Sequence, residues 1–379
     1  MIAYLDNSAT TRPIQPAITA MTECMRDGYF NPSSLYAPAM MCEKAMDHCR
    51  AAIEKTLAVR QGRVIFTSGG TESNNLAILS TVHAMRDVKH VIVSAYEHPS
   101  VSEPAEQLKK EGIRVTSLAV DSQGQLDWAM LEQALSDAPA LISVMQVNNE
   151  VGAMPDLDKL CQMVRSRAPA ALIHVDGVQG FARLPINMKE IDLYTLSAHK
   201  LGGPKGVGAL WTKKNVRLAP RQLGGSQELG LRAGTENTPG IAGLLAAIEH
   251  MPAGAAMRME ALRMRLLSGL RAVVPNIIVN GSESHRTAPH ILNVSFPGVR
   301  GEVMLHALEG ENVYCSTGSA CSSKKRKLSP VLLSMGVHPD IAECALRLSL
   351  CTDTTEEEID YACEKAGILY AALSRFRRK

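Results

Sequence analysis

The sequence has no apolar run that approaches the roughly 18 residues a membrane-spanning helix needs. Its first residues, Met1–Asp6, lack the basic region and apolar core of a secretion signal. It also lacks an excess of either charge, since 40 basic and 38 acidic residues leave a net charge of +2. These absences predict a cytoplasmic protein and argue against binding to nucleic acid or a membrane through bulk charge.

The nine cysteines form no CxxC pair, and their number is odd. This pattern indicates neither a disulfide framework nor a zinc site, so no metal site is predicted. Most of them should be small buried apolar side chains. The best candidate for a reactive thiol is Cys321, because it lies in a run of small residues and precedes the cations Lys324–Lys327, which favour thiolate. Cys315 is a weaker candidate, because it closes an apparent strand, where buried thiols are usually inert.

A chain of 379 residues suits two domains. After Gln61, short apolar runs alternate with helical patterns, which predicts an α/β fold with a mainly parallel, doubly wound sheet of seven strands flanked by helices. Ligands in such sheets bind beyond the carboxyl ends of the strands. The predicted strands are 64–67, 91–94, 113–116, 141–144, 171–175, 193–196 and 207–211, and the helices between them include 72–86, 99–111, 127–136 and 156–168.

A weaker α+β pattern follows a long helical stretch over 239–273. We expect a large domain over residues 15–255, and a small domain made of residues 1–14 and 256–379 that carries the cysteine segment. The elements expected in the C-terminal part are strands near 276–280, 291–295 and 346–350, and helices near 301–309, 338–345 and 355–373.

Several predicted strands end in residues that suit a phosphate-bearing ring cofactor. The Ser68–Thr71 turn leads from a strand into a helix, where open backbone N–H groups bind anions. His98 could stack on a planar ring or move protons, and Asn149 could orient a ligand oxygen. Asp176 could pair with a protonated pyridine nitrogen. Each also has an ordinary structural alternative, such as a capped turn, a core histidine or a helix N-cap.

The segment Ser197-Ala198-His199-Lys200 ends another strand and precedes a glycine-rich stretch. A lysine in this position can form a Schiff base with an aldehyde cofactor, while the neighbouring hydroxyl and imidazole hold its phosphate. The alternative is a surface-loop lysine. The convergence of an anion turn, a histidine, an amide, an aspartate and a lysine at one crevice favours the cofactor interpretation.

In these residues the chain resembles the cysteine desulfurases, in the class V branch of fold-type I pyridoxal-phosphate (PLP) enzymes. The resemblance extends over almost the whole length, and the cysteine segment is similar to that of the bacterial housekeeping and nitrogen-fixation group. The motifs that carry it are Tyr4–Thr11, Phe66–Asn74, Val147–Gly152, His174–Asp176, Ser197–Lys200, Arg232–Thr235 and Gly318–Cys321.

The resemblance implies a role for each matching residue. Lys200 would bind PLP and move the substrate proton with help from His98, and Cys321 would be the nucleophile. Arg347 would bind the substrate carboxylate, near Asn149. Thr235 would reach the phosphate of a neighbouring subunit, which implies a homodimer. The PLP-binding residues implied are Gly70, Thr71, His98, Asn149, Asp176, Gln179, Ser197, His199, Lys200 and Thr235.

The implied reaction converts L-cysteine to L-alanine and leaves a persulfide on Cys321. The sulfur would pass to an acceptor protein for iron–sulfur cluster, thio-cofactor or tRNA biosynthesis. Two alternatives stay open at this point: a related PLP lyase acting on selenocysteine or cystine-type substrates, and an idle scaffold that only docks sulfur-handling partners. The presence of Lys200, Asp176 and Cys321 argues against the scaffold.

Overall fold

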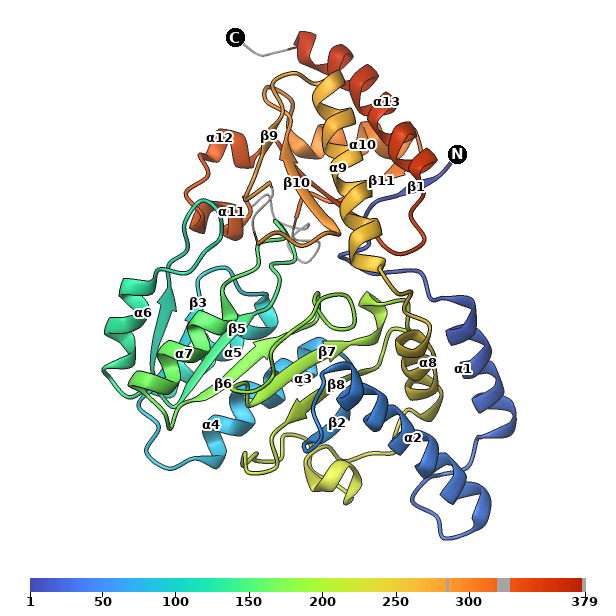
Figure 1. Ribbon diagram of the computed structural model, residues 1–379, viewed down its shortest axis with the longest axis vertical. Helices are drawn as coiled ribbons and strands as arrows, with labels where there is room; N and C mark the ends of the chain where they lie inside the picture. Colours follow the sequence, from blue (N-terminus) through green and yellow to red (C-terminus); the bar gives the residue numbers. More distant parts are fainter. Residues whose placement is uncertain (284–285, 319–327, 377–379) are drawn as a thin grey trace.

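A twisted seven-stranded sheet forms the centre of the larger part of the molecule (Figure 1). The computed structural model describes residues 1–283, 286–318 and 328–376. The strand order is β2-β8-β7-β6-β5-β3-β4, and only β8 runs antiparallel to its neighbours. The prediction of a mainly parallel seven-stranded sheet is therefore confirmed. The strands are β2 Arg63–Thr67, β3 His90–Ser94, β4 Arg114–Leu118, β5 Leu141–Met145, β6 Leu172–Asp176, β7 Leu193–Ser197 and β8 Gly208–Thr212.

Helices cover both faces of this sheet, because the strands are apolar on both sides and each face needs a cover. Helices α2, α6, α7 and α8 pack on one face, and α3 to α5 pack on the other. The helices of this part are α1 Gln15–Asp27, α2 Ala37–Thr56, α3 Gly70–Asn75, the π-helical η1 Leu76–Ser80, α4 Thr81–Ala84, α5 Pro99–Lys110, α6 Trp128–Leu135, α7 Leu157–Arg167, η2 Ala198–Lys200, η3 Gln227–Gly230 and α8 Thr238–Glu249.

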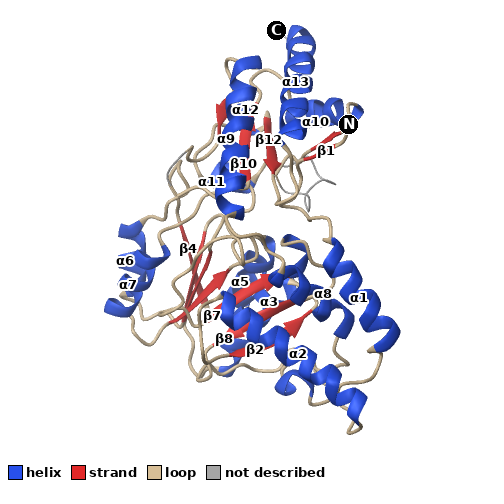
Figure 2. Cartoon of the chain, turned by 45° about the vertical axis from the view of Figure 1, so that its right-hand side comes forward, coloured by secondary structure: helices blue, strands red, loops and turns tan. Residues whose placement is uncertain are grey.

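The C-terminal elements form a second hydrophobic core above one end of the sheet (Figures 1 and 2). An antiparallel sheet of order β12-β10-β9 packs there against α9, α10 and α13, together with a short parallel pair of β1 and β11. The elements are β1 Ala3–Tyr4, α9 Ala255–Val273, β9 Ile278–Val279, β10 Ile291–Ser295, α10 Gly301–Gly310, β11 Val313–Tyr314, α11 Pro330–Ser334, α12 Pro339–Ala342, β12 Ala345–Ser349, α13 Glu356–Leu373 and η5 Ser374–Phe376.

Two of the predicted helices were wrong in extent. The stretch 239–273 divides into α8, which ends at Glu249, and α9, which begins at Ala255, because Pro252 and the N-cap Gly254, with a φ of +75°, lie between them. The helix predicted over 338–345 is only the four-residue α12, and β12 already begins at Ala345. Pairing of β12 with β10 outweighs the local helical pattern at that point.

The N-terminal segment connects the two parts of the molecule. After β1 pairs with β11, the backbone N–H of Asn7 donates to the carbonyl of Ser349 at 3.3 Å. A few residues later, the N–H of Thr11 donates to the carbonyl of His199 at 2.8 Å. The segment thus passes from the C-terminal core to the carboxyl end of β7 before α1 begins. Among the described residues, no helix has the length and apolar character to cross a membrane.

Candidate active site

Lys200 lies in η2, directly after the carboxyl end of β7. Its Nζ donates to the carbonyl oxygens of Ser8 at 2.5 Å and Ala9 at 2.8 Å, both in the N-terminal segment. Burial, followed by the positive charge of Arg347, lowers the pKa of Lys200 from its ordinary 10.5 to about 8. A useful fraction of this amine is therefore neutral near pH 7.5, as a nucleophilic or basic lysine requires.

Asp176 is the last residue of β6, and neighbours from two elements fix its carboxylate. Oδ1 accepts from the backbone N–H of Val178 at 3.0 Å, and Oδ2 accepts from Nδ2 of Asn74 at 2.8 Å. Beyond it, Gln179 donates through Nε2 to the carbonyl of Ser8 at 3.0 Å, while its Oε1 is buried without a hydrogen-bond partner. The edge of the sheet therefore presents a fixed carboxylate and an unused amide oxygen.

The glycine turn after β2 faces the end of β7. Gly69 has a φ of +151°, which side chains rarely allow, and a Cβ built on Gly70 would lie 2.7 Å from Cγ2 of Val178. A Cβ on Gly69 would lie 3.7 Å from Oγ of Ser197, which is itself buried without a partner. The turn thus opens onto an unsatisfied hydroxyl, and it leads into the helix that begins at Gly70, whose first N–H groups have no partner from a preceding helical turn.

Two histidines at the site are held as neutral imidazoles. His98 is the N-cap of α5, and its Nδ1 lies 2.7 Å from Oγ of Ser100. Burial lowers the pKa of His98 below its ordinary value. His199 lies 3.2 Å from Oγ1 of Thr10 through Nδ1, and burial together with the charge of Lys200 lowers its pKa to about 4. Neutral rings can donate one hydrogen bond and accept another.

Arg347 in β12 is a buried cation at the same edge, with only 2% of its surface exposed. Its Nη2 pairs with Oδ1 of Asp6 at 2.7 Å, and its Nη1 donates to the backbone carbonyl of Asn149 at 2.9 Å. Its Nε is buried without a partner. The hydrogen bond between Asn149 and Arg347 therefore uses the backbone carbonyl of Asn149 and not its side-chain amide.

The predicted nucleophile, Cys321, lies outside the described residues. The chain before it runs beside the site, because Ser316 and Arg347 exchange two backbone hydrogen bonds of 3.1 and 2.6 Å. The chain after it is also anchored there, because Oγ of Ser329 donates to Oε2 of Glu150 at 2.5 Å. Both flanks of the cysteine segment are therefore attached to the rim of the site.

The other eight cysteines are all free thiols, and five of them are buried. Burial raises the pKa of Cys315 from 9.0 to about 12 and that of Cys161 to about 11. These thiols are protonated near neutral pH and are poor nucleophiles.

The sequence and the fold were compared with those of known proteins. The model of the family described as Aminotransferase class-V matches residues 3–362. Cysteine desulfurase 2 of Trichormus variabilis is 40% identical over 363 residues, which cover 95% of this chain and 90% of the relative. The chain belongs to the class-V aminotransferases, and among them to the cysteine desulfurases. Membership of this family implies the use of PLP.

Solved structures agree with this family. A NifS-like protein superposes with a TM-score of 0.91 at 34% identity, covering 98% of this chain and 100% of that chain. SspA in complex with cysteine superposes with a TM-score of 0.80 at 29% identity, covering 93% and 100%. The fold predicted from the resemblance is confirmed, and so is the family. Cysteine desulfurases act on cysteine and transfer sulfur to acceptor proteins.

The structure brings most of the predicted site residues of this cysteine desulfurase to one edge of the sheet. Two are not placed there: Cys321 lies outside the described residues, and Thr235 is exposed, with no hydrogen bond that joins it to the others within the described chain. Sequence reasoning assigned no role to Asp6, Ser8 or Ala9, which hold Arg347 and Lys200. The dense run of polar and small residues ahead of the first helix was the signal that could have identified them.

Asn74 and Ser100 also escaped attention. Both occupy positions where a polar residue is ordinary, Asn74 near the end of α3 and Ser100 in the first turn of α5. Their side chains point to each other across the site and hydrogen-bond at 2.8 Å. Only the packing of the two helices makes this contact, and therefore no local pattern could have shown it.

Proposed function

We propose that this chain is a PLP-dependent enzyme that converts L-cysteine to L-alanine and holds the sulfur as a persulfide on Cys321. The persulfide then passes to an acceptor protein for iron–sulfur cluster, thio-cofactor or tRNA biosynthesis. The observation that carries the proposal is the environment of Lys200. Its amine has a pKa of about 8 and lies at the sheet edge that also presents Asp176 and Arg347.

The residues present fit PLP. The orphaned hydroxyl of Ser197 and the glycine turn suit its phosphate, and the orphaned Oε1 of Gln179 suits its ring hydroxyl. Asp176 suits a protonated pyridine nitrogen. Bound PLP would supply an electron sink for charge that develops on the substrate Cα. The residues that would hold it are Gly70, Thr71, His98, Asn149, Asp176, Gln179, Ser197, His199 and Lys200, with Thr235 serving a second subunit.

Arg347 and Lys200 have separate roles towards the substrate amino acid. Arg347 binds the substrate carboxylate, because a buried guanidinium with a free Nε offers the planar donors that carboxylates match. Lys200 takes the Cα proton on Nζ, which the carbonyls of Ser8 and Ala9 hold in place. His98, held at the same edge as a neutral imidazole, would help to hold the ring and would assist proton transfer.

Cys321 carries out the sulfur transfer. Its thiolate attacks the substrate sulfur, the C–S bond breaks, an S–S bond forms, and the carbon fragment gains a proton to leave as alanine. Cysteine plus enzyme thiol therefore becomes alanine plus enzyme persulfide. Cys321 follows Gly318 by three residues, which span at most about 11 Å. The anchoring of Ser316 beside Arg347 supports this reach.

The test is alanine formation from L-cysteine, together with mass spectrometry of the persulfide. Cys321→Ala should abolish both, whereas Cys315→Ala, a matched control only six residues away, should retain both because Cys315 is protonated near pH 7. Lys200→Ala should abolish alanine formation and the visible absorbance of lysine-bound PLP. Alanine release by Cys321→Ala at the wild-type rate would refute the assignment.

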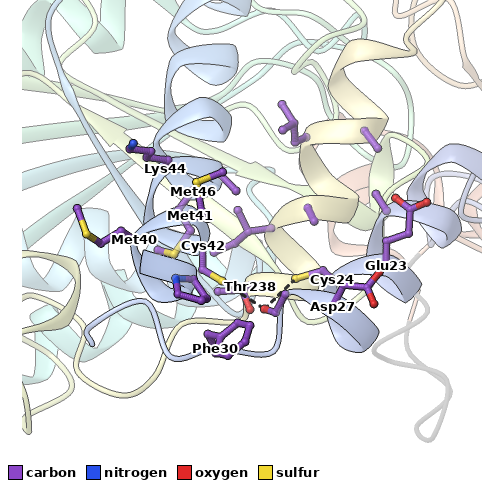
Figure 3. A pocket seen from close by; sticks show the side chains of 18 of the residues that line it. Glu23, Cys24, Asp27, Phe30, Met40, Met41, Cys42, Lys44, Met46 and Thr238 are labelled. Atoms are coloured by element: carbon purple, nitrogen blue, oxygen red, sulfur yellow. Dashed lines mark hydrogen bonds between the residues drawn. The ribbon is translucent and has the colours of Figure 1, made fainter. Parts of the chain in front are cut away.

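We further propose that the enzyme is a homodimer that uses a groove over α8. The groove has a volume of about 900 Å³ and lies between α1, α2 and α8. Figure 3 shows its methionine-rich wall, formed by Met40, Met41 and Met46, with Phe30 at the rim. Met41 is 64% exposed, and an apolar surface of this kind is typical of an interface. A second copy is the occupant because exposed Thr235 would complete the site of that copy.

Light scattering on a sizing column tests the dimer. Met41→Lys in the groove should shift the protein towards monomer, while Met257→Lys should not, because Met257 on α9 is also exposed, at 76%, but lies outside the groove. A wild-type protein that elutes as a monomer at micromolar concentration would refute the proposal.

We propose two further features. The division into a large domain over 15–255 and a small domain of 1–14 and 256–379 is supported by Ala3 and Leu5, which pack in the C-terminal core. A location in the cytoplasm is supported by the thiol chemistry, since a free catalytic thiol and free buried cysteines suit a reducing compartment.

A further inference from the structure

A chain of buried polar side chains runs from Asp176 to His98. Oδ2 of Asp176 accepts from Nδ2 of Asn74 at 2.8 Å, and the same Nδ2 donates to Oγ of Ser100 at 2.8 Å. Oγ of Ser100 lies 2.7 Å from Nδ1 of His98. Asn74 is fully buried and Ser100 is 6% exposed. The chain therefore joins two elements of the proposed site through two residues to which the reaction assigns no role.

The direction of each hydrogen bond in this chain is determined by its neighbour. The Asp176 carboxylate can only accept, so it turns the NH₂ group of Asn74 towards itself. Both hydrogens of that group are then used, one on Asp176 and one on Oγ of Ser100. Oγ of Ser100 accepts one of these hydrogens and keeps its own hydroxyl hydrogen, which it can donate to Nδ1 of His98 when Nδ1 carries no proton.

The backbone of α5 reinforces the same arrangement at His98. The N–H of Ser100 donates to Nδ1 at 3.1 Å, as expected for an N-cap histidine followed by Pro99. Because Nδ1 accepts from this N–H, it carries no proton in the neutral ring, and the hydroxyl of Ser100 must donate to it as well. The proton of neutral His98 must lie on Nε2.

We propose that Asn74 and Ser100 are positioning residues that fix His98 as its Nε2–H tautomer and transmit the orientation of Asp176 to it. This inference rests on the proposed function, because it gives His98 a defined proton for the reaction. Neither residue touches the reacting atoms. Each acts through the next member of the chain.

The charges around His98 determine how strongly this chain of hydrogen bonds affects the protonation of the ring. Burial is the largest influence and favours the neutral ring; Asp176 favours the charged ring and Lys200 the neutral one. A hydroxyl that donates to Nδ1 stabilises the neutral ring further, because this hydrogen bond must break before Nδ1 can be protonated. Removing the hydroxyl should therefore make His98 easier to protonate.

The test uses the PLP-loaded enzyme with ¹⁵N-labelled histidine. Ring ¹⁵N shifts report the tautomer and titration of His98, whose signals are assigned from their loss in His98→Gln. Ser100→Ala removes the hydroxyl, and Ser100→Thr restores one. Ser143→Ala is a matched control, because it removes the 2.8 Å bond between another buried serine and Nδ1 of another histidine, His174.

In the wild type, neutral His98 should carry its proton on Nε2. Ser100→Ala should raise the titration midpoint of His98, and the acidic limb of the kcat–pH profile, by about half to one pH unit. It should also lower kcat near pH 7 about three- to tenfold through misplacement of the ring. Ser100→Thr should recover both values, and Ser143→Ala should lower thermal stability without moving either.

A wild-type His98 with its neutral proton on Nδ1 would overturn the inference, as would a Ser100→Ala variant with unchanged titration. The wild-type tautomer can be read even if that variant fails to fold. Failure of the proposed function is separately visible, because a wild-type enzyme that forms no alanine from cysteine still yields the His98 shifts.

Discussion

Replacing Arg347 by Gln should slow the reaction of the PLP-free enzyme with added PLP near neutral pH. After burial, Arg347 is the largest influence that lowers the pKa of Lys200 from 10.5 to about 8. At pH 7.5 a lysine with a pKa of about 8 is about one-quarter neutral amine, whereas an ordinary lysine is about one part in a thousand neutral. Only the neutral amine attacks the PLP aldehyde.

The size of the effect follows from the charges. Loss of the guanidinium removes one nearby cation and leaves Asp6 unopposed, and both changes favour the protonated amine. Together they should raise the pKa of Lys200 by roughly one unit. The neutral fraction at pH 7.5 then falls from about 24% to about 3%, so the rate of attachment should fall about eightfold. The two rates should converge above about pH 9.5, where both amines are largely neutral.

Growth of the visible absorbance of lysine-bound PLP, followed by stopped flow between pH 6.5 and 10, measures this rate. Arg347→Lys is the control, because it retains a cation near Lys200 and should react nearly as fast as the wild type at pH 7.5. A wild-type rate that rises about tenfold per pH unit up to pH 10 would show an unperturbed lysine and refute the reasoning. An unchanged midpoint in Arg347→Gln would refute the role assigned to Arg347.

Three further changes have defined outcomes. Asp6→Asn keeps an acceptor for Arg347 but removes the counter-charge, and should lower the free energy of unfolding by about 2 kcal/mol, measured by urea denaturation; no loss would mean that the pair is not structural. Gly208→Ala should prevent stable folding or PLP retention, because its Cβ would lie 2.7 Å from Cα of Gly69; a normal PLP spectrum would contradict this contact. Burial raises the pKa of Glu97 to about 8, so wild-type stability should fall as pH rises from about 4.5 to 8, and Glu97→Gln should flatten that fall in thermal melts; parallel curves would exclude Glu97 as the cause.

The central sheet could be predicted because most of its strands are short runs rich in apolar residues between helical patterns. Strand β5, Leu141–Met145, is buried at every position, and the predicted strand over 141–144 differs from it by one residue. The small pair β1 and β11 escaped prediction, because two-residue strands carry no periodic signal. The end of α12 was misplaced because residues 343–345 continue a helical pattern that pairing with β10 overrides.

In the candidate site, too, some residues could be predicted from the sequence and others could not. Lys200, Asp176 and the Gly69–Gly70 turn stand at strand ends, where the rule for parallel sheets directs attention. Asp6 and Ser8 could not be placed by that rule, because they reach Arg347 and Lys200 from hundreds of residues away in the chain. Such contacts follow from the assembled fold and leave no trace in local spacing.

The N-terminal segment has a consequence for how this protein is made. A ribosome synthesises Asp6 and Ser8 before Arg347 and Ser349, which bond to them from 341 residues further along the chain. A nascent chain can form the large sheet early, but the carbonyls that hold Lys200 stay unanchored until residue 349 has left the exit tunnel. Loading of PLP in its final geometry should therefore wait until β12 has emerged, and a chain that terminates before β12 should fail to retain the cofactor.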